Sequence, residues 1–372
     1  MTVLLTGATG FLGSRLLLHL LTTRERVVTV LGRGDPSHLR WRVLKALEAV
    51  ASESIDAPAR ARLHCAGGDI TRPRLGLASA AYGHLAETAD AVWHCAGDIG
   101  LTGGRERMFR VNVQGTKHVL EFSAATPPEC RLVHMSTIAV AGDRKTGRVA
   151  ESDLTDSHGF VAHYDESKYQ AETLVHQWSL RLDRPAVVLR PSIVATDTQL
   201  TDGAPGHPLL ALGKTIATAV QGSGLGNPAQ TAQPGNSKVV RLLMPADATF
   251  NIIPDLYATE AMLRIGHDAA HDSHGVATFH VAHPVDTAMR LITEVIEARY
   301  PGLRLACVDS LPDPTATELL IAAHLRGFLS YSHHTRTYDR TGAVKFMAGL
   351  SDPPPIDREY LARALNLQIP QQ

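Results

Sequence analysis

The sequence predicts an α/β protein, built as a doubly wound parallel sheet with a smaller, mostly helical C-terminal lobe. Three observations lead to this prediction. A short apolar run at residues 3–5 leads directly into a glycine-rich turn. Similar runs then alternate with helical periodicity through the first half of the chain. After residue 195 the alternation stops, and helical patterns dominate the rest of the sequence.

Strands are expected where a short apolar or β-branched run is bounded by turn residues. Stretches with helical periodicity lie between these runs and supply the right-handed crossovers that keep the strands parallel. The expected strands cover residues 3–5, 27–31, 63–65, 91–94, 132–135 and 186–189, and the expected helices cover residues 11–21, 38–50, 108–123 and 165–182. Ligands of such sheets bind at the carboxyl ends of the strands, where we therefore expect the functional site.

The second half of the chain differs in amino-acid composition and in its hydrophobic pattern. Residues 196–238 are rich in Gly, Pro, Thr and Gln and contain no aromatic residue, so we expect an insertion or lid that buries little surface by itself. Residues 239–283 are expected to weave back into the sheet domain, with a final strand at 278–282. Helical patterns in residues 284–372 predict a second lobe, to which the insertion also belongs.

Composition excludes several classes of protein. The net charge of −1 offers no long-range attraction for nucleic acid, and no apolar run approaches the ~20 residues that span a bilayer. The four cysteines are far apart and lie in or beside apolar runs, as free buried thiols do. We therefore expect a cytoplasmic protein. No metal site is predicted, because His333 and His334 have no histidine or cysteine partner at metal-ligand spacing nearby.

The motif TGATGFLG places Gly7, Gly10 and Gly13 between the first expected strand and helix. Glycines here allow a tight turn and a close approach to a pyrophosphate, whose charge lies at the N-terminus of the helix. The alternative is a glycine turn that serves only strand-to-helix packing. The context favours a dinucleotide, so residues 1–195 are expected to form a Rossmann-type dinucleotide-binding domain, although the glycine spacing departs from the commonest fingerprint.

Arg33 stands at the end of the second expected strand, twenty residues after Gly13. An NAD enzyme usually carries an acidic residue at this place, whereas an arginine can bind a 2′-phosphate with two hydrogen bonds. The sequence therefore favours NADP(H) as the cofactor. The alternative is a solvated Arg33 with Asp35 as the ribose ligand.

Other strand ends supply further candidate contacts for the same cofactor. Asp69 and Ile70 follow the third strand and border the expected adenine site, while the small residues 95–97 follow the fourth strand and allow a close approach. The complete set of expected cofactor-binding residues is Thr6, Gly7, Thr9, Gly10, Phe11, Leu12, Gly13, Arg33, Asp69, Ile70, Cys95, Ala96, Gly97, Asn112, Tyr164, Lys168, Pro191, Ser192 and Ile193.

Tyr164 and Lys168 are four residues apart and therefore share one face of a helix. An ammonium beside a phenol stabilises the phenolate and lowers its pKa, which makes the tyrosine usable for proton transfer. Such a pair alone usually marks only a solvated helix face. Here it follows Ser136 and Thr137, which come directly after the fifth expected strand and can present a hydroxyl at the same edge.

Taken together, these motifs resemble the extended short-chain dehydrogenase/reductase family. The matching segments are TGATGFLG, GDI at 68–70, NVQGT at 112–116, HMST at 134–137, YDESK at 164–168 and LRPSIV at 189–194. Within that family the chain is similar to the thioester reductase group, which comprises the reductase domains of carboxylic acid reductases and nonribosomal peptide synthetases and the fatty acyl-CoA reductases. The subgroup resemblance rests on GDITRPRLGL, YDESKYQAE, NIIP at 251–254 and FHVA at 279–282.

The resemblance implies that Tyr164 is the general acid, that Lys168 binds the nicotinamide ribose and tunes the tyrosine, and that a hydroxyl polarises the substrate oxygen. Counting back from Gly142 selects Thr137 as this hydroxyl, with Ser136 as the alternative. Ser136 and His163 are candidate substrate contacts. The sequence departs from the family pattern at His163, where glycine is common, at Tyr169, where tryptophan is common, and across residues 196–237.

The implied activity is NADPH-dependent reduction of an acyl thioester, bound to coenzyme A or to a carrier protein, to an aldehyde. Onward reduction to the alcohol is left open. Residues 284–372 and the insertion would then form the substrate-binding lobe. One alternative is a relative that acts on a ketone, a secondary alcohol or a sugar nucleotide. A second is a non-catalytic NADP sensor, against which the intact Thr137, Tyr164 and Lys168 argue.

Overall fold

The computed structural model describes residues 1–51, 54–100, 104–201, 203–222, 237–269 and 275–367. Its centre is a sheet of seven parallel strands in the order β12-β7-β5-β4-β1-β2-β3. These strands are β1 (Thr2–Thr6), β2 (Val27–Gly32), β3 (Leu63–Gly67), β4 (Ala91–His94), β5 (Arg131–Met135), β7 (Ala186–Pro191) and β12 (Val276–Val281). The prediction of a doubly wound Rossmann-type sheet is confirmed. Its strand order reverses between β1 and β4, which is where such sheets bind ligands.

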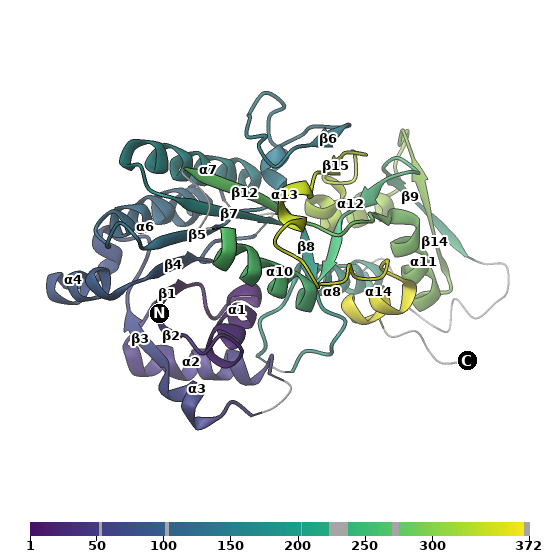
Figure 1. The fold of residues 1–372 in the computed structure, drawn as a ribbon. Helices are drawn as coiled ribbons and strands as arrows, with labels where there is room; N and C mark the ends of the chain where they lie inside the picture. The colour runs from purple at the N-terminus through teal and green to yellow at the C-terminus, as the bar shows by residue number, and fades with distance from the viewer. Residues whose placement is uncertain (52–53, 101–103, 202, 223–236, 270–274, 368–372) are drawn as a thin grey trace.

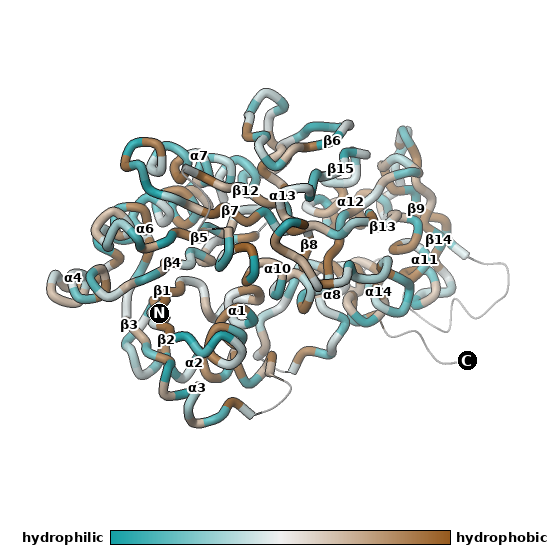
Figure 2. Tube along the Cα trace, viewed as in Figure 1, coloured by the Kyte–Doolittle hydropathy of each residue, from teal (hydrophilic) through white to brown (hydrophobic). Residues whose placement is uncertain are grey.

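The strands are apolar along their length because helices cover both faces of the sheet. In β1, Leu5 packs into one buried core and Leu4 into another, as the alternation of side chains along a strand requires. Figure 1 shows α4 (Ser79–Thr88), α6 (Gly115–Ala124) and α7 (His163–Leu182) on one side, and α1 (Phe11–Thr22), α2 (Pro36–Glu48) and α10 (Asp255–Asp268) on the other. In Figure 2 strand β1 is coloured as hydrophobic.

Short elements complete this domain. They are α3 (Ala57–Ala61), η1 (Pro73–Gly76), α5 (Arg105–Met108), η2 (Phe109–Gln114), η3 (Ile138–Ala141), β6 (Arg148–Val149), β8 (Ile193–Ala195) and β11 (Ile252–Pro254). The single helix expected at 108–123 is in fact α5, the π-helical turn η2 and α6 in succession. Within the described residues, no helix is long and apolar enough to cross a membrane.

The C-terminal lobe has its own buried core and lies to the right in Figure 1. It contains α8 (Pro208–Gly222), β9 (Lys238–Leu243), β10 (Thr249–Phe250), β13 (Thr287–Ala288), α11 (Met289–Arg299), β14 (Leu303–Val308), α12 (Ala316–Leu329) and α14 (Arg358–Ala364). Strand β14 pairs in parallel with β9, whereas the sequence pattern of this lobe predicts helices only. A short segment, β15 (Thr337–Tyr338) and α13 (Thr341–Val344), returns to the sheet domain, where β15 pairs with β6.

The insertion buries more surface than expected. Leu209, Leu212, Ile216 and Val220 on α8 lie in the core of the C-terminal lobe. Their spacing is that of one helical face, which the overall Gly, Pro and Thr content of the segment concealed. A side chain in place of Gly213 would meet the backbone oxygen of Leu365 at 1.8 Å, so the helix packs closely on the C-terminal segment. Residues 202 and 223–236 of the expected lid lie outside the described residues.

Candidate active site

The turn between β1 and α1 has the close backbone contacts that a nucleotide corner needs. Gly7 has a φ of +78°, and a Cβ there would come within 2.6 Å of the backbone nitrogen of Ala96. A Cβ on Gly13 would come within 2.1 Å of the backbone oxygen of Gly7. Gly10 is the N-cap of α1 and adds no side chain over the first-turn N–H groups, which have no partner within the helix. This cradle fits a dinucleotide, because a pyrophosphate can reach these N–H groups directly.

Buried polar contacts fix the end of β4 beside this turn. The Thr6 hydroxyl lies 2.9 Å from His94 Nδ1 and accepts a hydrogen bond from the Ala96 nitrogen at 3.2 Å. On the other side of the ring, His94 Nε2 lies 3.1 Å from the Thr116 hydroxyl. Burial lowers the pKa of His94 to about 3, so the ring is neutral and bridges two hydroxyls. Thr6 therefore has an internal role, in aligning β1 with β4.

The neighbouring residues of the corner have different surroundings. Thr9 is exposed and Leu12 is half-buried. The ring of Phe11 lies 3.7 Å below the guanidinium carbon of Arg15 and 5.2 Å from the ring of His207, which belongs to the insertion. The insertion thus contacts the expected nucleotide corner.

At the end of β2, Arg33 is exposed, whereas the Asp35 carboxylate caps helix α2. Asp35 Oδ1 accepts hydrogen bonds from the backbone nitrogens of Ser37 at 3.1 Å and His38 at 3.0 Å. The bond from His38 is the main reason that the pKa of Asp35 is lowered. This capping role of Asp35 supports Arg33 as the residue free to bind a 2′-phosphate.

Asp69 and Ile70, which follow β3, both have partners within the protein. Burial acts to raise the pKa of Asp69, but hydrogen bonds from the Thr71 nitrogen and hydroxyl and the charges of Arg33 and Arg72 lower it overall. The Ile70 side chain would be 2.8 Å from a Cβ on Gly115, so it packs against the start of α6. Ile70 therefore supports the fold beneath the expected adenine site.

The proton-transfer residues meet at the carboxyl end of β5. The Thr137 side chain lies close enough to the Tyr164 phenol to act against the rise of its pKa, and it accepts a hydrogen bond from the Ala139 nitrogen at 3.2 Å. Lys168 is buried one helical turn after Tyr164, and its Nζ donates to the Met135 oxygen at 2.6 Å. Helix α7 therefore carries the phenol and the ammonium to the residues that end β5. The structure brings together the three groups predicted from sequence.

The ionisation of these groups differs from the sequence-based expectation. Burial raises the pKa of Tyr164 to about 12, and the neighbouring Asp165 charge acts in the same direction, while the Thr137 side chain acts against it. The expected lowering of this pKa by Lys168 is wrong for this structure, because burial dominates. Burial also lowers the pKa of Lys168 to about 8, although Glu172 and Cys95 oppose this shift. Tyr164 consequently holds its proton at neutral pH, as a proton donor must.

Ser136 faces a different partner from Thr137. Its hydroxyl donates to Glu172 Oε2 at 2.5 Å, and Glu172 Oε1 pairs with Arg190 Nη2 at 2.6 Å. Glu172 and Arg190 are both completely buried. Although burial acts to raise it, the Arg190 charge and the hydrogen bonds hold the pKa of Glu172 well below its usual range. The Ser136 hydroxyl is thus committed to a buried ion pair, which leaves Thr137 as the hydroxyl beside Tyr164.

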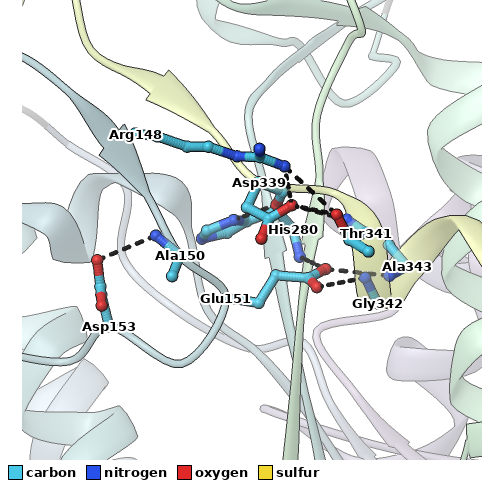
Figure 3. Close-up of polar contacts among 9 residues, drawn as sticks. All are labelled: Arg148, Ala150, Glu151, Asp153, His280, Asp339, Thr341, Gly342 and Ala343. Carbon is cyan, nitrogen blue, oxygen red and sulfur yellow. Dashed lines mark hydrogen bonds and ion pairs between the residues drawn. The ribbon is translucent and has the colours of Figure 1, made fainter.

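The ion pair continues into a cluster of polar contacts formed by Glu151, His280 and the α13 segment (Figure 3). Arg190 Nη1 donates to the Glu151 backbone oxygen at 3.2 Å and lies 3.3 Å from His280 Nε2. The Glu151 carboxylate accepts from the nitrogens of Gly342 at 2.7 Å, Ala343 at 3.1 Å and His280 at 3.1 Å. This cluster attaches the α13 segment to the sheet behind the candidate site.

Asn112 forms hydrogen bonds within the protein, and Cys95 is half-buried. Asn112 Nδ2 donates to Ser167 Oγ and to the Asp98 oxygen, each at 2.9 Å, and its Oδ1 accepts from the Asp98 nitrogen at 2.7 Å. It therefore ties the π-helical turn η2 to the catalytic helix. A Cβ on Gly97 would be 3.2 Å from Asn112 Oδ1, so this side chain also lies against the β4 end. Burial raises the pKa of the Cys95 thiol to about 12, so the thiol stays protonated.

The last candidates lie at the end of β7 and the start of α7. Pro191 ends β7, the Ser192 nitrogen donates to the Val281 oxygen at 3.0 Å, and the Ile193 nitrogen donates to the Asn251 oxygen at 3.1 Å. His163 is exposed at the start of α7, with Nδ1 3.8 Å from Glu166 Oε2. It is thus at the surface of the candidate site, and a substrate role for it stays a prediction.

A family model described as "Male sterility protein", which represents an NAD-binding domain, matches residues 5–253. The chain belongs to this family. The predicted resemblance is confirmed at the level of this family. All the motifs that carry the resemblance, except FHVA, start within the matched range.

Curated proteins to which the chain is similar include two synthases. An isonitrile lipopeptide synthase from Streptomyces coeruleorubidus is 32% identical over 177 residues, which cover 47% of this chain and 12% of the relative. A synthase of the same name from Mycobacterium tuberculosis is 27% identical over 326 residues, which cover 82% of this chain and 12% of the relative. The chain thus matches only a small part of either synthase.

Solved structures share the fold of this family member over nearly its whole length. The terminal R domain from the myxalamid PKS-NRPS pathway has a TM-score of 0.74 at 22% identity, covering 98% of this chain and 89% of that one. A thiolation-reductase di-domain from an archaeal nonribosomal peptide synthetase has a TM-score of 0.72 at 20% identity, covering 98% and 74%. A UDP-glucuronic acid 4-epimerase from Bacillus cereus, in complex with NAD, has a TM-score of 0.61 at 17% identity, covering 99% and 96%.

Proposed function

We propose that this protein reduces an acyl thioester, carried by coenzyme A or by a carrier protein, to an aldehyde with NADPH. The observation that carries the proposal is the meeting of three groups at the carboxyl end of β5: Lys168 is anchored on the Met135 oxygen, Thr137 follows the strand, and Tyr164 lies one helical turn before Lys168. The similarity to parts of two isonitrile lipopeptide synthases, and to a terminal R domain in fold, supports a carrier-bound substrate.

The chain supplies two hydroxyls for one developing charge. As the thioester carbonyl is reduced, its oxygen becomes an oxyanion, to which Tyr164 and Thr137 donate hydrogen bonds. A bound nicotinamide nucleotide would supply the hydride. Tyr164, whose pKa is about 12, gives up its proton only when the substrate oxygen has become strongly basic. Collapse of the resulting hemithioacetal breaks the C–S bond and releases a thiol and the aldehyde.

Lys168 holds its position through a backbone contact. With Nζ bonded to the Met135 oxygen, the ammonium is held beside the end of β5, where it would bind the ribose of the nicotinamide nucleotide. Arg33 supports the choice of NADPH, since it is exposed where a 2′-phosphate would lie and Asp35 is engaged in capping α2.

The test measures NADPH oxidation and thiol release together. Purified protein is incubated with NADPH and an acyl-coenzyme A, or with an acyl group on a phosphopantetheinylated carrier, and the product is identified as aldehyde or alcohol. We expect equimolar NADPH oxidation and thiol release when the aldehyde is the product. Ketones and UDP-sugars serve as the comparison substrates. Turnover of these, with no thiol release from any thioester, would refute the proposal and favour the alternative dehydrogenase or epimerase activity.

A further inference from the structure

A tyrosine of the C-terminal lobe contacts the first turn of the catalytic helix. Tyr331, which follows α12, donates its hydroxyl to Asp165 Oδ1 at 2.5 Å. Asp165 is completely buried, and its Oδ2 accepts from the Ala162 nitrogen at 3.2 Å, which caps the start of α7. One carboxylate therefore holds both the start of the catalytic helix and a residue of the other lobe.

This contact lies next to the proton donor. Asp165 directly follows Tyr164, and its negative charge disfavours ionisation of that phenol. The Tyr331 phenol is near enough to Tyr164 for the two groups to interact electrostatically. Burial raises the pKa of Asp165 to about 6, whereas the Tyr331 hydroxyl, the Ala162 nitrogen and the Arg336 charge act to lower it. The charge beside Tyr164 thus depends on a hydrogen bond from the C-terminal lobe.

The charged and titratable groups that face Asp165 come from three elements. Tyr164 lies on its own helix, Tyr331 follows α12, and Arg336 and Tyr338 belong to the segment of β15. Arg336 Nη1 donates to the backbone oxygens of Gly142 and Arg144, and its Nε donates to the Tyr338 hydroxyl at 2.8 Å. Hydrogen bonds from Arg336 therefore connect the segment from Tyr331 to Tyr338 with the loop that follows η3.

We propose that Tyr331 is a positioning residue of this site. Its hydrogen bond to Asp165 makes proton donation by Tyr164 depend on the position of the C-terminal lobe. This inference rests on the proposed reductase function. A buried carboxylate without its hydroxyl partner is poorly compensated, so it takes up a proton more readily and holds the start of α7 less firmly. The two changes act in opposite directions on the proton-transfer step: loss of the Asp165 charge eases ionisation of Tyr164, whereas a loosened start of α7 misplaces its phenol, and we expect the misplacement to dominate. Neither change reaches the glycine-rich corner at β1.

The experiment compares Tyr331→Phe with the wild type and with Tyr360→Phe. Tyr360 is a matched control, because its hydroxyl also donates from the C-terminal lobe, but to the Ala195 oxygen of β8, at 2.7 Å, instead of to a residue of α7. For Tyr331→Phe we expect a fall in kcat for thioester reduction of roughly tenfold or more, as for loss of a hydrogen bond to a charged group. The dissociation constant for NADPH, followed by fluorescence, should stay within about twofold of the wild-type value. For Tyr360→Phe, kcat should be unchanged.

A second readout needs no turnover. The raised pKa of Asp165 means that its contribution to the free energy of unfolding is present below its ordinary value of 3.8 and is lost as the pH rises through about 6. Tyr331→Phe should move this transition to higher pH, and Asp165→Asn should abolish it. Urea unfolding between about pH 4 and pH 8 measures both.

The possible outcomes separate the two proposals. A wild type that reduces thioesters, together with a Tyr331→Phe variant of unchanged kcat and unchanged pH dependence, overturns the inference about Tyr331. A wild type that releases no thiol refutes the reductase function instead, and the pH dependence of unfolding still decides whether Tyr331 controls Asp165. If Asp165→Asn does not fold, Tyr331→Phe decides alone, since it removes only a hydroxyl.

Discussion

Ser136 donates its hydroxyl to Glu172 Oε2 at 2.5 Å, so the residue directly before Thr137 is held by the helix that carries Tyr164 and Lys168. The same carboxylate pairs with Arg190, in the strand next to β5. The hydroxyl of Thr137 and the phenol of Tyr164 are therefore positioned by one buried ion pair, which touches neither of them.

Replacing Glu172 by Gln should destabilise the protein by about 3–5 kcal/mol, because it leaves the buried Arg190 guanidinium without its counter-charge. Urea unfolding measures this loss. Glu166→Gln is the matched control on the same helix, since Glu166 forms an exposed pair with Arg105 and its loss should cost no more than about 1 kcal/mol. Equal effects of the two variants would show that the buried pair is not what holds this region together.

Removing the phenol hydroxyl should separate chemistry from cofactor binding. Tyr164→Phe should lower kcat for thioester reduction by roughly 10²–10⁴-fold, because the oxyanion loses its proton donor. NADPH affinity, measured by fluorescence titration, should change little. Tyr169→Phe, one helical turn and a half further on, removes a hydroxyl from a ring that packs on Phe160 and should leave kcat as it is. A Tyr164→Phe variant with wild-type kcat would assign the acid role elsewhere.

Lys168→Met should abolish reduction yet stabilise the fold at pH 7, on the order of 1–3 kcal/mol, because a buried ammonium is removed. The pKa of Lys168 is lowered from 10.5 to about 8, so the stability that this group contributes is present above 10.5 and is lost as the pH falls through about 8. The difference in free energy of unfolding between Lys168→Met and the wild type should therefore become smaller as the pH rises from 8 towards 10. The exposed Lys214, changed to Met, should show no such pH dependence. A variant that is less stable than the wild type at pH 7 would contradict this account.

Arg33→Ala should reduce the preference for NADPH over NADH, as a ratio of kcat/KM values, by roughly tenfold to a hundredfold through loss of the contact to the 2′-phosphate. Asp35→Ala should leave the ratio unchanged and lower the stability of the protein by about 1 kcal/mol, since Asp35 caps α2. The reverse result, a changed ratio only for Asp35→Ala, would establish Asp35 as the ribose ligand.

Local sequence patterns were sufficient to predict the sheet. Its inner strands, such as β1 and β7, are apolar runs buried on both faces, and such runs can be recognised without knowledge of their neighbours. Helix α8 was overlooked because its apolar stripe lies within a segment rich in small and polar residues. Strand β14 was missed because its partner β9 lies about sixty residues earlier, and only that pairing makes it a strand.

The candidate site was predictable only as far as its motifs extend. The spacing of Tyr164 and Lys168 placed them on one helical face, but their surroundings set their pKa values, and burial is not visible in a spacing. The contact between Asp165 and Tyr331 joins residues 166 positions apart and has no local signal. The ion pair of Glu172 and Arg190 does have a local signal in the sequence, because each is a charged residue next to an apolar stretch of an expected helix or strand.

The outer strand β12 comes from residues 276–281, long after β7 at residues 186–191. During synthesis on the ribosome, the open edge of β7 must therefore wait for some ninety further residues before its neighbour emerges. An unpaired edge of this kind invites association between nascent chains. Shortened versions of the protein that stop near residue 195 should accordingly aggregate, and expression of the isolated N-terminal part would need β12 supplied as a separate peptide or grafted through a linker.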